Sequence, residues 1–247
     1  PCSGATDTVR ASCSAAVDPE YLSTPRPIEF PTAGGRTAHA FHYPPANLTC
    51  RVPENASPPL IVCSHGGPTG ATSSVLDMRI QYWTRRGFAV VDVNYGGRTG
   101  DGREYRQRLD GTWGVTDVDD CIHAARYLVD EGHADAARLT IRGGSAGGYT
   151  VLRALTVRPG FFRAAVCRYG ISNLFSLAAD THKFEARYND SLLGPLPEAS
   201  QVYRDRSPLF AAESIRDPVI LFQGAEDEVV PKAQSDAIVE SLKRRNV

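Results

Sequence analysis

Residues 142–148 read Arg-Gly-Gly-Ser-Ala-Gly-Gly, and this stretch decides the fold. Residues 137–141 before it predict a short buried strand, and residues 149–155 after it predict a helix. A strand, Gly-x-Ser-x-Gly and a helix together form the nucleophile-elbow pattern. Such a turn holds its serine in strained backbone angles, so that the hydroxyl projects from the sheet, and small neighbours let strand and helix pass closely. The pattern therefore predicts Ser145 as a nucleophile.

A glycine-rich phosphate-binding loop is the plain alternative for the same turn. No Walker-type lysine follows it, and its glycines do not fit Gly-x-Gly-x-x-Gly. The amide of Ala146 would lie at a helix N-terminus, where it is placed to bind an oxyanion. We therefore favour nucleophilic catalysis.

The bulk composition limits the class of protein. A chain of 247 residues can bury a full core, and 42% hydrophobic with 22% charged residues is typical of a globular domain. The formal net charge of -1 argues against a nucleic-acid partner. No apolar run approaches the ~20 residues needed to span a bilayer, so we expect no membrane span. The sequence begins at Pro1, without an initiator methionine or a signal-peptide pattern, so we expect it to be a segment of a longer protein.

The six cysteines form no Cys-x-x-Cys pair, so the sequence predicts no zinc site and no redox site. Three of them fall in predicted strands or a helix, where a reduced cysteine acts as a small apolar residue. This favours a cytoplasmic protein. Glycosylation sequons beginning at Asn47, Asn55 and Asn189 support secretion as the alternative.

Two regions differ in composition. Residues 1–26 are polar, small and proline-containing, and they predict a linker or the end of a preceding domain. Residues 27–247 alternate apolar strands with helices, which predicts an α/β domain with a mainly parallel sheet and helices on both faces. The expected strands are 27–30, 37–43, 59–64, 88–93, 137–141, 163–168 and 218–222, and the expected helices are 76–86, 117–129, 149–155 and 232–245. Residues 171–215 are expected to be irregular with short helices.

Ligands of such sheets bind at the carboxyl ends of the strands, and a glycine-rich motif follows the strand 59–64 there. It reads His65-Gly66-Gly67-Pro68, whose glycines let backbone amides point at a developing oxyanion. We expect an oxyanion hole formed by this loop, at Gly66 and Gly67, together with Ala146. We expect His65 to anchor the loop and not to act as a base.

Three acidic residues, Glu226, Asp227 and Glu228, follow the strand 218–222. Such a run is usually a solvated surface. A carboxylate after a late buried strand can also orient and charge-stabilise a histidine. The placement predicts Asp227 as the acid of a catalytic triad.

Four motifs, in this order, carry a resemblance to a known family. They are His-Gly-Gly-Pro at 65–68, Trp-Gly-Val-Thr-Asp-Val-Asp-Asp at 113–120, Gly-Gly-Ser-Ala-Gly-Gly at 143–148 and Phe-Gln-Gly-Ala-Glu-Asp-Glu-Val-Val-Pro at 222–231. Over residues 25–247 the chain resembles the catalytic domain of the prolyl oligopeptidase family, closest to its dipeptidyl-peptidase and acylaminoacyl-peptidase branches. The resemblance implies an α/β-hydrolase fold and a serine peptidase acting on short peptides without a cofactor.

The resemblance also implies roles for single residues. Ser145 matches the family nucleophile and Asp227 the triad acid, and the oxyanion-hole region is matched by Gly66, Gly67 and Ala146. The pocket for the residue before the scissile bond would be lined by Leu174, Phe175, Phe184 and Val230. Plain core packing is the alternative for these four residues. At 100–102 the chain reads Gly-Asp-Gly where the family often has Gly-Tyr-Gly, a departure expected to alter only the rim of the loop.

The family orders its triad serine, aspartate, histidine, so the histidine should follow Asp227. All six histidines precede that residue. We therefore expect the domain to be truncated at its C-terminal end, without a base, and this exact chain to be inactive. His182, near the expected pocket, is the alternative base. The β-propeller that usually precedes this domain in the family would end within residues 1–26.

Two other functions remain open. A carboxylesterase or lipase fits the elbow and the His-Gly-Gly loop, and a non-catalytic binding protein fits the absent histidine. The motifs at 113–120 and 222–231 favour a peptidase, and the intact elbow favours an enzyme. The strand beginning at Pro218 would form an exposed sheet edge, so we also expect association into a homo-oligomer.

Overall fold

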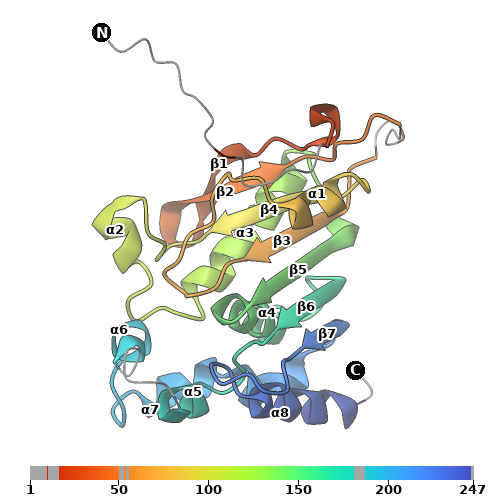
Figure 1. Cartoon of the computed structure of the whole chain (residues 1–247). Helices are drawn as coiled ribbons and strands as arrows, with labels where there is room; N and C mark the ends of the chain where they lie inside the picture. The colour runs from red at the N-terminus through yellow and green to blue at the C-terminus, as the bar shows by residue number, and fades with distance from the viewer. Residues whose placement is uncertain (1–9, 11–16, 50–52, 54–55, 181–186, 246–247) are drawn as a thin grey trace.

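The computed structural model describes residues 10, 17–49, 53, 56–180 and 187–245. These residues form a seven-stranded sheet in the order β1-β2-β4-β3-β5-β6-β7, shown from one edge to the other in Figure 1. The strands are β1 (Arg26–Thr32), β2 (Arg36–Tyr43), β3 (Leu60–Ser64), β4 (Ala89–Asn94), β5 (Leu139–Gly144), β6 (Ala164–Arg168) and β7 (Val219–Phe222). Each expected strand is therefore confirmed, with shifts of a few residues at the ends.

The sheet is mainly parallel. Strands β4, β3, β5, β6 and β7 run parallel to one another, and β2 pairs antiparallel with both β1 and β4. The β1–β2 hairpin turns through Gly34 and Gly35, whose φ angles of 70° and 69° lie in the left-handed region that favours glycine. The expected parallel sheet is thus confirmed.

Helices cover both faces of the sheet, because side chains alternate between the faces along each strand. Leu60 and Val62 of β3 face the larger core, under α3 (Thr116–Asp130) and α4 (Ala146–Val157). Ile61, between them, faces the opposite side and joins a smaller cluster with Ile80 of α1 (Met78–Thr84). The two-sided arrangement predicted from the sequence is confirmed.

The remaining helices lie in the segments around the strands, with α8 after the last one. They are α2 (Gly102–Gln107), α5 (Leu174–Asp180), α6 (Tyr188–Leu193), α7 (Ser200–Arg206) and α8 (Lys232–Lys243), with 3-10 turns η1 (Pro19–Tyr21), η2 (Ala33–Gly35), η3 (Ala136–Arg138) and η4 (Pro208–Ser214). In Figure 1, α5, α7 and α8 gather at the lower end of the molecule, and α6 lies above them on the left. None of the helices among the described residues combines the length and apolarity needed to cross a bilayer.

Strand pairing brings three loops together at the carboxyl ends of the parallel strands. Ser64 of β3 lies opposite Gly143 of β5, so the loop after β3 lies beside the turn at Ser145. Arg168 of β6 lies opposite Phe222 of β7, which brings the loop after β7 to the same edge. The three loops with candidate site residues therefore share the carboxyl edge, where ligands of parallel sheets bind.

We expect the isolated 247-residue chain to associate through β7. Among the described residues β7 pairs only with β6, and its Ile220 and Phe222 are 50% and 52% exposed. An open apolar strand edge is a template for pairing with another chain. Ile220→Lys should shift sedimentation velocity profiles towards the monomer. Leu48→Lys, at a comparably exposed (51%) apolar residue outside the sheet, should leave the profile unchanged. A monomer for the unsubstituted chain at high concentration would contradict this expectation.

Candidate active site

Ser145 lies between β5 and α4 in a strained conformation. Its φ of 56° and ψ of -126° are rare for a residue with a side chain. The Ser145 N–H donates to the carbonyl of Arg168 at 3.1 Å, and its own carbonyl accepts from the N–H of Tyr149 at 3.0 Å. Strand β6 and helix α4 therefore hold the turn by hydrogen bonds, and backbone strain of this kind is concentrated at functional sites.

Glycines make this turn sterically possible. A Cβ built on Gly147 would overlap the carbonyl oxygen of Ser64, and one built on Gly143 would overlap the backbone of Gly147. A Cβ on Gly148 would lie 2.7 Å from the Cα of Gly170. The small residues predicted around Ser145 thus allow β3, β5 and α4 to approach closely.

The loop after β3 lies against Ser145. A Cβ on Gly66 would lie 3.5 Å from the Cβ of Ser145, so Gly66 is its direct neighbour. Gly67 has a φ of 70°, which favours glycine. Ala146 is the first residue of α4, so its N–H has no acceptor within that helix. Gly66, Gly67 and Ala146 thus lie around the serine.

His65 is packed into the base of this loop. Its ring stacks on Tyr95 with centroids 4.2 Å apart, and its Nδ1 lies 3.1 Å from the carbonyl oxygen of Gly66. The Tyr95 hydroxyl donates to the carbonyl of His65 at 3.3 Å. Burial lowers the pKa of His65 to about 4, so the ring is neutral at pH 7. These contacts fit an anchor for the loop.

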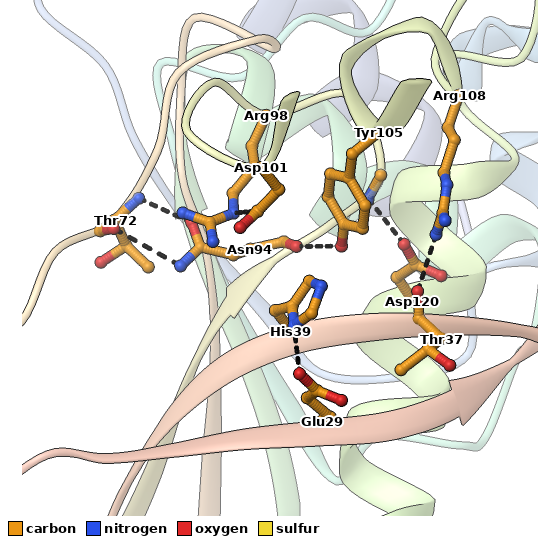
Figure 2. A network of polar contacts seen from close by, with 11 residues as sticks. Glu29, Thr37, His39, Thr72, Asn94, Arg98, Asp101, Tyr105, Arg108 and Asp120 are labelled. Carbon is orange, nitrogen blue, oxygen red and sulfur yellow. Dashed lines mark hydrogen bonds and ion pairs between the residues drawn. The ribbon is translucent and has the colours of Figure 1, made fainter. Parts of the chain in front are cut away.

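Polar contacts from β4 fix the far end of the same loop (Figure 2). The N–H of Thr72 donates to Oδ1 of Asn94 at 2.9 Å, and Tyr105 donates its hydroxyl to the carbonyl of Asn94 at 2.7 Å. The N–H of Gly96 donates to Asp120 at 2.7 Å. At the unusual Gly-Asp-Gly stretch, Asp101 forms an ion pair with Arg98. The loops after β3 and β4 are therefore held together.

Asp117 forms hydrogen bonds that link α3 to α4, the helix that follows Ser145. Its carboxylate accepts from the N–H of Gly114 and from the hydroxyl of Thr150 on α4, both at 2.6 Å. Asp117 is fully buried, and this burial raises its pKa to about 6. The motif at 113–120 thus ties the start of α3 to α4. The sequence signalled the motif, but nothing in it revealed which aspartate makes this tie.

Asp227 is held by its own loop. Its Oδ1 accepts from the N–H groups of Val229 and Val230 at 3.0 and 2.9 Å, and its Oδ2 accepts from Nε2 of Gln223 at 3.2 Å. Gln223 also donates to the carbonyl of Val230 at 2.8 Å and accepts from the hydroxyl of Ser235 at 2.9 Å. Gln223 was missed at the level of sequence, although it lies in the quoted motif at 222–231.

A cavity of about 360 Å³ opens beside Ser145. It is lined by Gly67, Pro68, Thr69, Trp113, Ser145, Ala146, Ile171, Leu177, Tyr188, Asn189, Val229 and Val230. Two larger hollows, of about 500 and 820 Å³, lie beside α1 and do not include Ser145. The smaller cavity is therefore the candidate substrate pocket.

The expected pocket residues have different positions. Val230 lines the cavity, whereas Leu174 is fully buried in the larger core. Phe175 packs against Tyr203 and Phe210, with ring centroids 5.5 and 6.2 Å away. Neither Leu174 nor Phe175 lines the cavity, because α5 turns these side chains towards α7 and η4. Phe184 lies outside the described residues.

No histidine among the described residues lines this cavity. The alternative base, His182, lies outside the described residues. Sequence reasoning also missed Trp113, Tyr188 and Asn189 as wall residues, because they come from separate segments that only the tertiary fold brings together.

Gly147→Ala should destabilise the domain by roughly 1–3 kcal/mol, because the new Cβ must push α4 away from β3. Gly224→Ala is the matched control, since its Cβ would meet Asp227 at an ordinary 3.6 Å. Thermal unfolding of both variants measures the difference. Equal stability of the two would show that the elbow is not tightly packed.

Gln223→Leu should loosen the loop that holds Asp227, because it removes the donor to Oδ2 of Asp227 and to the carbonyl of Val230. We expect the amides of Val229 and Val230 to exchange hydrogen about tenfold faster, in line with one lost hydrogen bond. Gln201→Leu, which removes an exposed contact to Asp205 on α7, is the control. Unchanged exchange in Gln223→Leu would contradict the role assigned to Gln223.

Comparisons with known proteins agree with this geometry. A match to the prolyl oligopeptidase family covers residues 74–247. Dipeptidyl aminopeptidase BIII of Pseudoxanthomonas mexicana is 34% identical over 198 residues, which are 78% of this chain and 29% of that protein. The acylamino-acid-releasing enzyme of Sus scrofa is 33% identical over 202 residues, 79% of this chain and 28% of the enzyme.

A solved structure resembles the whole chain. The puromycin-hydrolyzing peptidase of Mycobacterium tuberculosis superposes with a TM-score of 0.96 at 47% identity, covering 100% of this chain and 38% of that one. The chain spans less than a third of the length of the two curated relatives. Because the family match includes the elbow, the acid loop and more than half of the residues, this chain belongs to the prolyl oligopeptidase family and has its α/β-hydrolase fold.

Proposed function

We propose that the protein containing this chain is a serine peptidase that hydrolyses short peptides by acyl transfer through Ser145. The observation that carries the proposal is the strained serine, at φ 56°, on the wall of a cavity that also includes Gly67 and Ala146. The relatives named as a dipeptidyl aminopeptidase and an acylamino-acid-releasing enzyme support this substrate class.

Each residue of the site has one role in this mechanism. Ser145 attacks the scissile carbonyl, and its proton passes to a histidine supplied by residues outside those described. Asp227 holds that imidazole and stabilises its charged form. The amides of Ala146 and of the Gly66–Gly67 loop bind the oxyanion, and the loss of one such donor typically costs ~10²–10³ in rate.

The fixed position of Asp227 supports its role as the acid. Its carboxylate is only half-buried and already accepts three hydrogen bonds from its own loop. It is thus fixed before any histidine binds, which lowers the entropic cost of orienting the base. Glu226 and Glu228, beside it, are exposed.

We further propose a linker or domain end over residues 1–26, a peptidase domain over 27–247, and a cytoplasmic location, with secretion as the alternative. The support for a reducing compartment is that Cys63, Cys121 and Cys167 are unpaired. A homo-oligomer is the proposed assembly, supported by the exposed apolar side chains of β7.

Ser145→Ala in the full protein should abolish hydrolysis of a peptide p-nitroanilide, with a loss of roughly 10³-fold or more, because the nucleophile is gone. Ser241→Ala on α8, which does not line the cavity, should keep normal turnover. His182→Ala should also keep turnover if the base comes from elsewhere. Normal activity of Ser145→Ala would contradict the mechanism.

The rival functions are separated by the same assay. Hydrolysis of a matched ester without hydrolysis of the amide would favour a carboxylesterase. Binding of the peptide without turnover of either substrate would favour a non-catalytic binding protein.

A further inference from the structure

Asn189 has an unusual environment in the wall of the cavity beside Ser145. It belongs to α6, only 7% of its surface is exposed, and it lines the cavity. Its side chain makes no hydrogen bond with any other described residue, yet it is not among the polar side chains sealed from solvent. The amide atoms are therefore reachable by solvent in a residue that lines the cavity, where a ligand or water can hydrogen-bond them. Because Asn189 is largely buried and its side chain makes no hydrogen bond with a described residue, its amide is available to a polar group of a ligand.

The other polar side chains of the wall are already occupied or closed. The hydroxyls of Tyr188 and Thr69 lie 2.5 Å apart and share a hydrogen bond. The Nε1 atom of Trp113 is sealed from solvent. Apart from Ser145 itself, Asn189 is the polar side chain of the described wall that is left for a ligand.

The other residues of the cavity wall determine which kind of substrate side chain fits the cavity. Trp113, Ile171, Leu177 and Val230 are apolar and largely buried, and no charged side chain of the described residues lines the cavity. Among the described wall residues, a charged substrate side chain would find no counter-charge. A volume of about 360 Å³ accommodates an aromatic ring. The fitting side chain is therefore a ring with one neutral polar atom.

We propose that Asn189 determines specificity by hydrogen-bonding the phenolic oxygen of a tyrosine-type residue that precedes the scissile bond. This inference rests on the proposed peptidase function of Ser145. The ring lies between the apolar walls, and the carboxamide donates to or accepts from the hydroxyl. A phenylalanine fills the same space but leaves the carboxamide unpaired and shielded from water, which penalises its binding.

The test compares tyrosyl and phenylalanyl amides that are otherwise identical, with the full protein. We expect kcat/KM to favour the tyrosyl substrate about tenfold, the value of one neutral hydrogen bond. Asn189→Leu, which has a similar volume without hydrogen-bonding atoms, should bring this ratio close to one. Asn189→Ser, too short to reach the oxygen, provides the same test if the leucine variant does not fold.

Leu177→Met is the matched control, because it reshapes the same wall without changing its polarity and should preserve the ratio. A ratio near one in the unsubstituted protein, or an unchanged ratio in Asn189→Leu, would overturn the assignment. An equal loss for both substrates would also overturn it, since it would indicate that Asn189 contacts the peptide backbone or only supports the fold.

A binding measurement separates this inference from the proposed function. Calorimetric titration of the Ser145→Ala protein with the two amides gives the same ratio without turnover, and Asn189→Leu in that background should abolish it. Absence of hydrolysis by the unsubstituted protein would contradict the peptidase function, while the binding ratio would still decide the role of Asn189.

Discussion

The site depends on the close approach of three backbone segments around Ser145. The carbonyls of Ser64 and His65 occupy the space that a side chain on Gly147 would need, and the backbone of Gly147 occupies the space next to Gly143. Under that constraint the chain can pass from β5 to α4 only by a sharp turn, and the residue at its apex takes a φ of 56°. The place of Ser145 in the cavity wall and the free helix amide of Ala146 both follow from this geometry. The strained turn is held by close packing against the loop after β3 and by two backbone hydrogen bonds of Ser145.

Buried carboxylates stabilise the loops around this turn. Asp117 joins the start of α3 to α4, and Asp120 joins the loop after β4 to β1 through Thr32. Burial raises the pKa of both residues, and hydrogen bonds from backbone and hydroxyl donors oppose that rise. Since each of these carboxylates has donors from two segments, the loops are positioned by groups that do not take part in the chemistry.

The sequence predicted those parts of the protein that depend on short-range pattern. The apolar strands, the elbow at Ser145 and the loop at Gly66–Gly67 have local signals, and the structure has them at these places. Features that depend on long-range contacts were missed. Leu174 and Phe175 were assigned to a pocket, but the direction of α5 places them in the core and against Tyr203. The roles of Gln223 and Asn189 were also not predictable from the sequence. They depend on which hydrogen-bond partners each side chain has in the folded domain, and the local sequence does not reveal these partners.

The hydrogen bonds of Asp227 have a consequence for how selectivity would be expressed. Its Oδ1 accepts from the N–H groups of Val229 and Val230, and these same two residues form part of the cavity wall. The helix that follows, α8, is clamped to the loop after β6 by Gln234, whose Oε1 accepts from the N–H groups of Ser172 and Asn173 at 2.9 and 2.7 Å. A side chain in the cavity would therefore contact the same two residues whose N–H groups hold the Asp227 carboxylate. In the proposed mechanism the pocket and the acid thus share Val229 and Val230, so a well-fitting substrate residue would be distinguished by faster turnover as well as by tighter binding.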